Sequence, residues 1–213
     1  MSKKTGAAPV VFLGDYIDRG PDSRGVVVAL IQFKKDFPQT VFLRGNHEDL
    51  FLKVADRSLE DDYELFLQNG GQATLDSYGD SWHNIPKEHW DFIRETRLYF
   101  RLQAEAADPV SGMKSLRDFL FVHAGVKPKV ALEKQSKEDL LCIRGTFIRS
   151  AHPMGSTIVV HGHTVLENVP GRAPCRIALD SGVYQKGPIK RRGRVMGGKL
   201  TCCNVLTREV CQV

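Results

Sequence analysis

The chain has little cysteine and no long hydrophobic run. Its 213 residues include five cysteines, no two of which form a Cys-x-x-Cys pair. The odd number and the lack of such pairs argue against a disulfide framework or a zinc cage, and predict small, buried hydrophobic side chains. Apolar runs such as residues 7–13 are far shorter than the roughly 20 residues that a membrane-spanning helix needs. The sequence therefore predicts no membrane span.

Recognisable targeting features and low-complexity tracts are also missing. Two lysines and a short apolar stretch run directly into Gly14 and Asp15 without a small-residue cleavage site, which argues against a signal peptide and favours a cytoplasmic location. Hydrophobic residues make up 42% and charged residues 26% of the chain, as in ordinary globular proteins. We expect one domain, residues 1–213, long enough to bury a full core.

The positive charge is concentrated near one end. The net charge is +5, and residues 186–199 hold six lysines and arginines with no acid. A single basic loop, residues 185–196, is a weaker nucleic-acid signal than a basic face with interleaved aromatic residues. We expect a solvated hairpin loop and no nucleic-acid partner, with attraction of an anionic partner as the alternative.

The first half of the chain alternates between strand and helix patterns. An apolar run at residues 9–13 ends at Gly14, a helix is predicted for residues 23–33 with Ser23 as N-cap, and residues 40–43 form the next apolar run. Strand, helix and strand within about 30 residues form a βαβ unit, which is normally parallel. The pattern predicts an α/β fold.

Further elements follow along the chain. Helices are predicted for residues 49–55, 59–67 and 86–95, and Ser136 begins a capping-box pattern before a short helix. Strands are predicted for residues 98–102 and 118–122, separated by a polar loop at residues 104–115. Later strands are predicted for residues 157–160, 176–179 and 200–206.

Polar clusters come directly after four of the predicted strands. They are Asp15 to Arg19, Asn46-His47-Glu48, His123, and His161-Gly-His163. In open α/β sheets, sites form at the carboxyl ends of strands. We therefore expect these clusters to converge.

Each cluster has an ordinary structural interpretation beside a functional one. An aspartate beside glycine, such as Asp15, is often a turn cap, but it can also bind or bridge a divalent cation. Arg19 offers a planar fork that suits phosphate, or a local ion pair. Asn46 offers a neutral oxygen ligand, and His47 can hold a proton near neutral pH.

The two strand-end histidine motifs complete a mixed nitrogen and oxygen set. Such a set suits manganese, iron or zinc better than calcium or magnesium. In His161-Gly-His163, both side chains lie on one face if the strand continues, so only one is expected to face a metal.

Together, Gly14-Asp-Tyr-Ile-Asp-Arg-Gly20, Gly45-Asn-His-Glu48, Val122-His-Ala-Gly125 and Gly162-His-Thr164 resemble, in this order, the motifs of calcineurin-like metallophosphoesterases. Within these the chain is most similar to bacterial serine/threonine protein phosphatases of the phosphoprotein phosphatase type. The resemblance runs from about Val10 to Leu206. It implies a β-sandwich flanked by helices, and two divalent metal ions about 3.5 Å apart, Mn²⁺ first, with iron or zinc as alternatives.

The resemblance also implies which residues bind metal. Asp15 would bridge both ions, and Asn46, His123 and His163 would complete the second site.

The remaining implied roles are catalytic. His47 would protonate the leaving oxygen and Asp18 would orient that imidazole, while Arg19 and Arg144 would hold the phosphate oxygens. The implied reaction is metal-activated attack of water on a phosphomonoester, with phosphoserine or phosphothreonine in proteins as substrate.

Two departures from the family pattern keep alternatives open. No Asp-x-His occurs in the chain, so the first strand, the first helix and two ligands of the first metal are expected to be missing, with His161 as a conceivable replacement. Arg144 is followed by Gly-Thr-Phe147 and preceded by Leu-Cys-Ile, where relatives more typically have Trp before and Glu after it. The alternatives are a diadenosine tetraphosphate hydrolase, which acts on a phosphorylated small molecule, and a truncated, inactive phosphate- or metal-binding module.

Overall fold

The structure is a computed structural model. It describes residues 9–57, 59–107, 112–166, 169, 171–173, 175–185, 189–191, 194–196 and 198–213.

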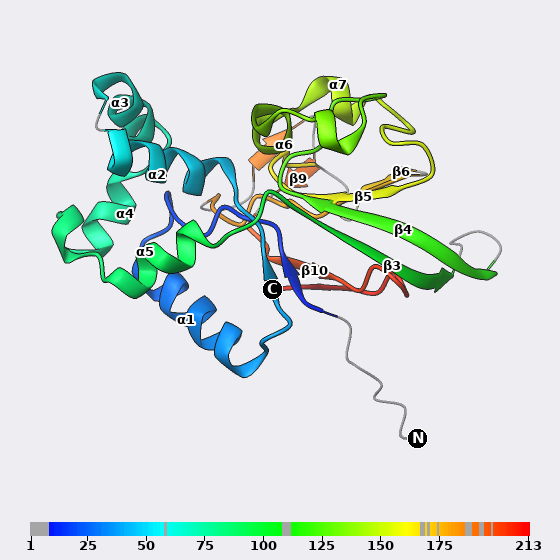
Figure 1. Cartoon of the computed structure of the whole chain (residues 1–213), viewed down its shortest axis with the longest axis horizontal. Helices are drawn as coiled ribbons and strands as arrows, with labels where there is room; N and C mark the ends of the chain where they lie inside the picture. Colours follow the sequence, from blue (N-terminus) through cyan, green and yellow to red (C-terminus); the bar gives the residue numbers. More distant parts are fainter. Residues whose placement is uncertain are drawn as a thin grey trace.

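The first βαβ unit forms as the sequence predicts. Strand β1 (Val11–Phe12) pairs in parallel with β2 (Val41–Phe42), and α1 (Ser23–Asp36) connects them. The N-cap of α1 is Asp22 rather than Ser23, because the Asp22 carboxylate accepts the Gly25 N–H while the Ser23 hydroxyl is used elsewhere. The helices that follow lie on the same side of the molecule (Figure 1). They are α2 (Asn46–Arg57), α3 (Glu60–Gln68), α4 (Gln72–Ser77), η1 (Trp82–Asn84) and α5 (Lys87–Arg94).

A second, five-stranded mixed sheet forms the other half. Its order is β3-β4-β5-β7-β6, with β4, β5 and β7 parallel and the two outer pairs antiparallel. The strands are β3 (Tyr99–Ala107), β4 (Lys114–Val122), β5 (Ile158–His161), β6 (Gly171–Ala173) and β7 (Arg176–Ala178). The α/β prediction is confirmed.

The two sheets pack on each other. One buried cluster joins Val41 and Leu43 of the first sheet region to Phe119, Phe121 and other residues of the second. The opposite face of the five-stranded sheet is covered by η2 (Leu132–Lys134), α6 (Lys137–Cys142) and α7 (Gly145–Ile148), which Figure 1 shows above β4 and β5. The ends of the strands in the two sheets therefore lie next to each other, and this region is called the junction below.

Two short hairpins complete the described chain. Strand β8 (Ile189–Arg191) pairs with β9 (Arg194–Met196), and β10 (Thr201–Cys203) pairs with β11 (Val210–Gln212). The predicted basic loop at residues 185–196 contains β8 and β9, and its remaining residues 186–188 and 192–193 lie outside the described part.

Some expectations from the sequence are wrong. Residues 104–107 and 114–115 of the predicted polar loop are strand, because β3 and β4 remain paired as far as Ala107 and Lys114. This pairing overrides the low strand propensity of Ala and Glu. Helix α4 was not predicted.

The expectation of buried cysteines holds for Cys175 and fails for Cys202 and Cys211, which are exposed on a surface hairpin. No helix among the described residues is long and apolar enough to span a bilayer.

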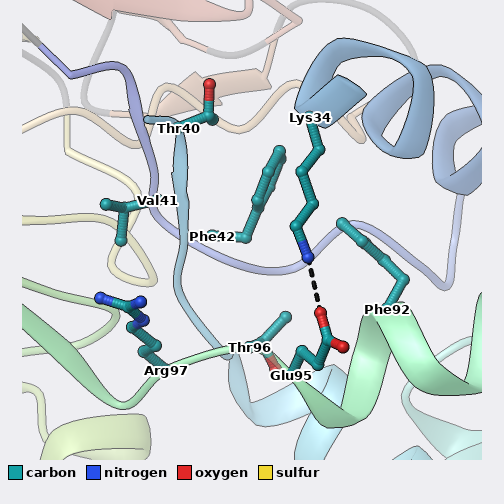
Figure 2. A pocket seen from close by; sticks show the side chains of 8 residues that line it. All are labelled: Lys34, Thr40, Val41, Phe42, Phe92, Glu95, Thr96 and Arg97. Atoms are coloured by element: carbon teal, nitrogen blue, oxygen red, sulfur yellow. Dashed lines mark hydrogen bonds and ion pairs between the residues drawn. The ribbon is translucent and has the colours of Figure 1, made fainter. Parts of the chain in front are cut away.

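A hollow of about 270 Å³ lies between α1, β2 and the end of α5, where Lys34 and Glu95 form an ion pair (Figure 2). None of the polar motif residues lines it.

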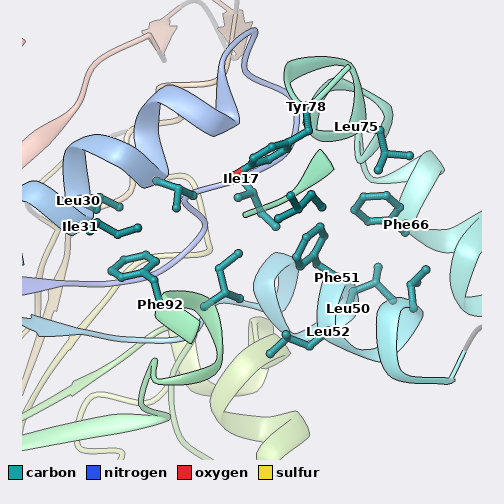
Figure 3. Packing of buried hydrophobic residues seen from close by; sticks show 14 of the residues in the cluster. Ile17, Leu30, Ile31, Leu50, Phe51, Leu52, Phe66, Leu75, Tyr78 and Phe92 are labelled. Atoms are coloured by element: carbon teal, nitrogen blue, oxygen red, sulfur yellow. The ribbon is translucent and has the colours of Figure 1, made fainter. Parts of the chain in front are cut away.

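Aromatic side chains hold the helical half together. Phe51 is fully buried, and its ring lies 4.8 Å from that of Trp90 and 5.0 Å from that of Trp82. Figure 3 shows Phe51 at the centre of this cluster, near Phe66 and Leu50.

We predict that Phe51→Ala lowers the free energy of unfolding by about 3–5 kcal/mol, because the truncation leaves a cavity in this cluster. Urea denaturation followed by tryptophan fluorescence measures the change. The exposed Phe37→Ala serves as a control and should change stability little. Equal effects of the two substitutions would contradict the packing.

A buried histidine makes the stability of the helical half depend on pH. His89 Nδ1 lies 2.8 Å from the Tyr78 hydroxyl, and both side chains are buried. Burial lowers the pKa of His89 below its ordinary value, although Glu88 partly opposes this. Folding therefore favours the neutral ring, and this contribution is complete above the unfolded pKa of about 6.5 and is lost as the pH falls below it.

We predict that the melting temperature of the wild type falls more steeply between pH 7.5 and about 5.5 than that of His89→Asn, which keeps a polar group near Tyr78. Calorimetry of both proteins over this pH range measures the difference. Parallel profiles would show that His89 does not titrate with unfolding.

Candidate metal centre

The turns after β1 and β2 touch at two glycines. A Cβ atom on Gly14 would lie 2.5 Å from the Gly45 nitrogen, and one on Gly45 would lie 2.1 Å from Asp15 Oδ1. Gly14 also has φ of +96°, a conformation that other residues rarely adopt. Only glycine at both positions lets the two polar turns approach this closely.

Glu48 connects the same two turns through hydrogen bonds to its carboxylate. Its carboxylate accepts the N–H groups of Asp15, Tyr16 and Gly45 at 2.7–2.8 Å, and the side chain is fully buried. Burial and the charge of Asp15 raise the pKa of Glu48, and the backbone donors oppose this rise. Three backbone groups are thereby held in one fixed arrangement.

The four predicted metal ligands lie close together beside these two turns. His123 Nε2 lies 3.1 Å from Asn46 Oδ1, 3.2 Å from His163 Nδ1 and 3.4 Å from Asp15 Oδ1. Asp15, His123 and His163 form a group of ligand atoms that all lie within 4.8 Å of one another. The Asp15 side chain remains 27% exposed, so the centre is open to solvent.

The protonation pattern of this cluster fits a cation. His123 Nδ1 lies 2.7 Å from the Leu13 carbonyl, which only accepts, so Nδ1 donates a proton to this carbonyl and Nε2 faces the cluster. Burial, with the charges of the nearby His123 and Arg144, lowers the pKa of His163 to about 3, so this ring is neutral. Burial alone would raise the pKa of Asp15, but the charges of His123 and His47, together with the backbone N–H that His47 donates to the carboxylate, lower it and keep the carboxylate ionised.

Candidate ligand atoms of two imidazoles, an amide and a carboxylate thus lie close together. His163 Nε2 is buried without a hydrogen-bond partner in the described structure. A divalent metal ion could be held by these atoms, and mixed nitrogen and oxygen ligands suit manganese, iron or zinc.

The two histidines of the last motif separate. Strand β5 ends at His161, and His163 has φ of +61°, so alternation does not continue. The His161 ring is buried against Phe147 at 4.8 Å between ring centroids, and burial lowers its pKa to about 4. Of the pair, His163 belongs to the candidate ligand group and His161 does not.

His47 and Asp18 form a buried pair beside the centre. His47 Nδ1 donates to Asp18 Oδ2 at 2.6 Å, and the Thr74 hydroxyl donates to Asp18 Oδ1 at 2.7 Å. The Asp18 N–H is held by the hydroxyls of Thr74 and Ser23. Burial alone would lower the pKa of His47, but the bond to Asp18 and the charges of Asp15 and Asp18 raise it. The imidazole is fixed in orientation and able to carry a proton.

Backbone strain is concentrated at these residues. Asp15, Asp18, Arg19 and His163 are four of the seven non-glycine residues with positive φ in the described part of the chain. Each such residue costs roughly 1–3 kcal/mol and persists only where surrounding contacts hold it. Because such strain lowers stability, its concentration at these residues indicates a functional site.

Two exposed arginines lie at the edge of the centre. Arg19 is held by Nε–H donation to the Asn69 carbonyl at 3.2 Å, and its guanidinium lies 4.5 Å from the centroid of the Tyr184 ring. Arg144 donates from Nη1 to the carbonyl of His163 at 2.9 Å. Both predicted anion-binding residues therefore have fixed contacts beside the ligand cluster.

Several residues that shape the site are not among those predicted from the sequence. Glu48 is predicted only as part of a motif, and Thr74, Asp180 and Tyr184 lie outside the predicted clusters. Burial, followed by the charge of Asp15, raises the pKa of Asp180, whose carboxylate accepts the Gly182 N–H at 2.8 Å. Asp180 and Tyr184 flank a glycine directly after a predicted strand, the same signal that identified the other clusters.

One comparison with known proteins bears on this arrangement. A family model described as calcineurin-like phosphoesterase matches residues 3–171. The match covers all four metal-ligand positions, and also His47, Asp18, Arg19 and Arg144. It ends before Asp180, Tyr184 and the β10–β11 hairpin.

We predict that Gly45→Ala weakens Mn²⁺ binding about tenfold or more, because the new Cβ would displace the Asp15 carboxylate. Titration calorimetry with Mn²⁺ measures the affinity. Gly20→Ala is the matched control, since its Cβ would lie 3.8 Å from the nearest backbone oxygen and Gly20 has no positive φ. His163→Ala, which removes a ligand without crowding, should also weaken binding, and unchanged Mn²⁺ affinity in it would contradict the proposed ligand set.

Proposed function

The chain belongs to the calcineurin-like phosphoesterase family, a family of metal-dependent hydrolases, and we propose that it hydrolyses phosphoserine and phosphothreonine in proteins. The observation that carries the proposal is the convergence of Asp15, Asn46, His123 and His163 beside the His47–Asp18 pair.

The ligand set would hold a divalent metal ion, for which we propose Mn²⁺. When bound, such an ion supplies Lewis acidity toward the phosphoryl oxygens and lowers the pKa of a coordinated water. Family resemblance implies two ions, whereas the described residues bring together one group of candidate ligands, which includes Asp15, His123 and His163. We therefore propose one firmly held ion, and metal titration of the intact chain gives the stoichiometry.

Protein groups around the metal would bind the phosphate and supply the proton for the leaving oxygen. The guanidinium groups of Arg19 and Arg144 bind phosphate oxygens and orient the monoester. His47 holds a proton for the leaving oxygen, and Asp18 keeps the ring oriented with its other nitrogen toward the substrate. Thr74 and Ser23 in turn hold Asp18, so that the proton donor is positioned before the substrate binds.

The open position of the site supports a protein substrate. Arg19 and Arg144 are exposed, and Asp15 retains solvent access, so a phosphorylated side chain on a protein surface can reach the centre. A dinucleotide can also enter such a site, so direct comparison of substrates is needed.

We predict Mn²⁺-dependent hydrolysis of p-nitrophenyl phosphate, with kcat lowered about 10²–10⁴-fold in His47→Ala because the proton donor is lost. Asp18→Asn should lower kcat as well while leaving Mn²⁺ affinity close to that of the wild type. The control is His83→Ala, which removes an exposed histidine outside the site. A folded wild type that binds Mn²⁺ but shows no turnover would instead support the binding-module alternative.

The substrate class is tested with the same preparations. We expect higher kcat/KM on phosphoserine and phosphothreonine peptides than on diadenosine tetraphosphate or phosphorylated small molecules. The reverse order would support the dinucleotide alternative and contradict the protein-substrate proposal.

A further inference from the structure

Two exposed cysteines face each other on the β10–β11 hairpin. In the register of this antiparallel pair, Cys202 lies directly opposite Cys211. Directly opposed residues have side chains on the same face of the sheet. Both side chains are exposed, although cysteine is among the residue types most often buried.

The ladder gives the spacing between these residues. Leu200 and Val213 exchange both N–H···O bonds, at 2.8 and 3.1 Å. Since hydrogen-bonded and non-hydrogen-bonded pairs alternate, Cys202 and Cys211 also form a hydrogen-bonded pair, with Cα atoms about 5.5 Å apart. This spacing falls within the roughly 4.4–6.8 Å range found for disulfides.

We propose that Cys202 and Cys211 form a reversible disulfide when the protein meets a low-molecular-weight disulfide such as oxidised glutathione. The thiolate of one cysteine attacks the glutathione disulfide, forming a mixed disulfide and releasing one glutathione. The thiolate of the other cysteine then attacks the protein sulfur of the mixed disulfide and releases the second glutathione. The two protein thiols lose two electrons and two protons, and oxidised glutathione is reduced to two glutathione molecules.

The other cysteines are placed differently. Cys203, next to Cys202 in sequence, packs against the buried cluster between the sheets. Cys175 is buried, with its sulfur 3.1 Å from His152 Nδ1. Cys142 is partly buried, and burial together with Glu138 raises its pKa to about 12, which keeps it a thiol. The opposed pair is thus the accessible one.

The geometry favours a bond that is readily reduced. Cβ atoms of directly opposed residues lie about 4.5–5.5 Å apart, whereas a disulfide brings them to about 3.8 Å. Closing this difference strains the bond, and strained disulfides are the labile and regulatory ones.

The cross-link would join β11 covalently to β10, and β10 contacts Ser181 in the segment after β7. The Thr201 hydroxyl lies 2.8 Å from the Ser181 hydroxyl and accepts from Gln212 Nε2 at 3.0 Å. Figure 1 shows β10 below β3, and the Cys202 and Cys211 side chains are exposed, so a small disulfide can reach them. The proposal does not depend on phosphoester hydrolysis.

The test uses the whole chain, fully reduced and then treated with oxidised glutathione. We expect a loss of two of the five thiols and two hydrogen atoms in mass, without dimers on non-reducing gels. Trypsin cleaves after Lys199 and Arg208, which places Cys202 and Cys211 in different peptides, residues 200–208 and 209–213. These peptides should be linked after oxidation and separate after reduction.

Variants identify the sulfur atoms. Linkage should persist in Cys203→Ser and disappear in Cys202→Ser and in Cys211→Ser, and only proteins that form the link should gain melting temperature on oxidation. Peptides joined through Cys203, stable glutathione adducts without a link, intermolecular disulfides, or five remaining thiols would each overturn the proposal.

Discussion

The close contact between the turns after β1 and β2 is the constraint on which the rest of the site depends. Gly14 and Gly45 leave no room for side chains, and the buried Glu48 carboxylate binds backbone N–H groups from both turns. The turns carry Asp15 and Asn46, so this contact places an anionic and a neutral oxygen ligand together. Any side chain at Gly45 would occupy the position of the Asp15 carboxylate.

The second half of the site comes from a different sheet. His123 follows β4 and His163 follows β5, and the bond from His123 Nδ1 to the Leu13 carbonyl ties the two sheets at the junction. This single bond joins residues far apart in the sequence and also sets the tautomer, because the accepting carbonyl requires the proton on Nδ1. The apolar cluster between the sheets, including Leu43 and Phe121, holds the junction at the required separation.

Electrostatics and strain in the site oppose stability in ways that favour metal binding. Burial keeps His163 neutral, the charges of His123 and His47 keep Asp15 ionised, and several of the site residues adopt positive φ. Each feature costs stability in the absence of a ligand. The aromatic packing around Phe51 and the covered faces of the larger sheet offset these costs elsewhere in the fold.

The sequence by itself determined the α/β class, the first βαβ unit and the clustering of polar residues after strands, because glycine breaks and apolar runs are local signals. Its short, continuous motifs also predicted Asp15, Asn46, His123 and His163 as metal ligands, and the structure brings these residues together. The continuation of β3 to Ala107 and the start of β4 at Lys114 were not predictable, since cross-strand pairing overrode local propensity. Only the tertiary structure decided that His163 rather than His161 faces the centre, that Glu48 and Thr74 position the site, and that Cys202 faces Cys211. These outcomes depend on contacts between residues distant in sequence, and on backbone turns such as that at His163 that no local pattern specifies.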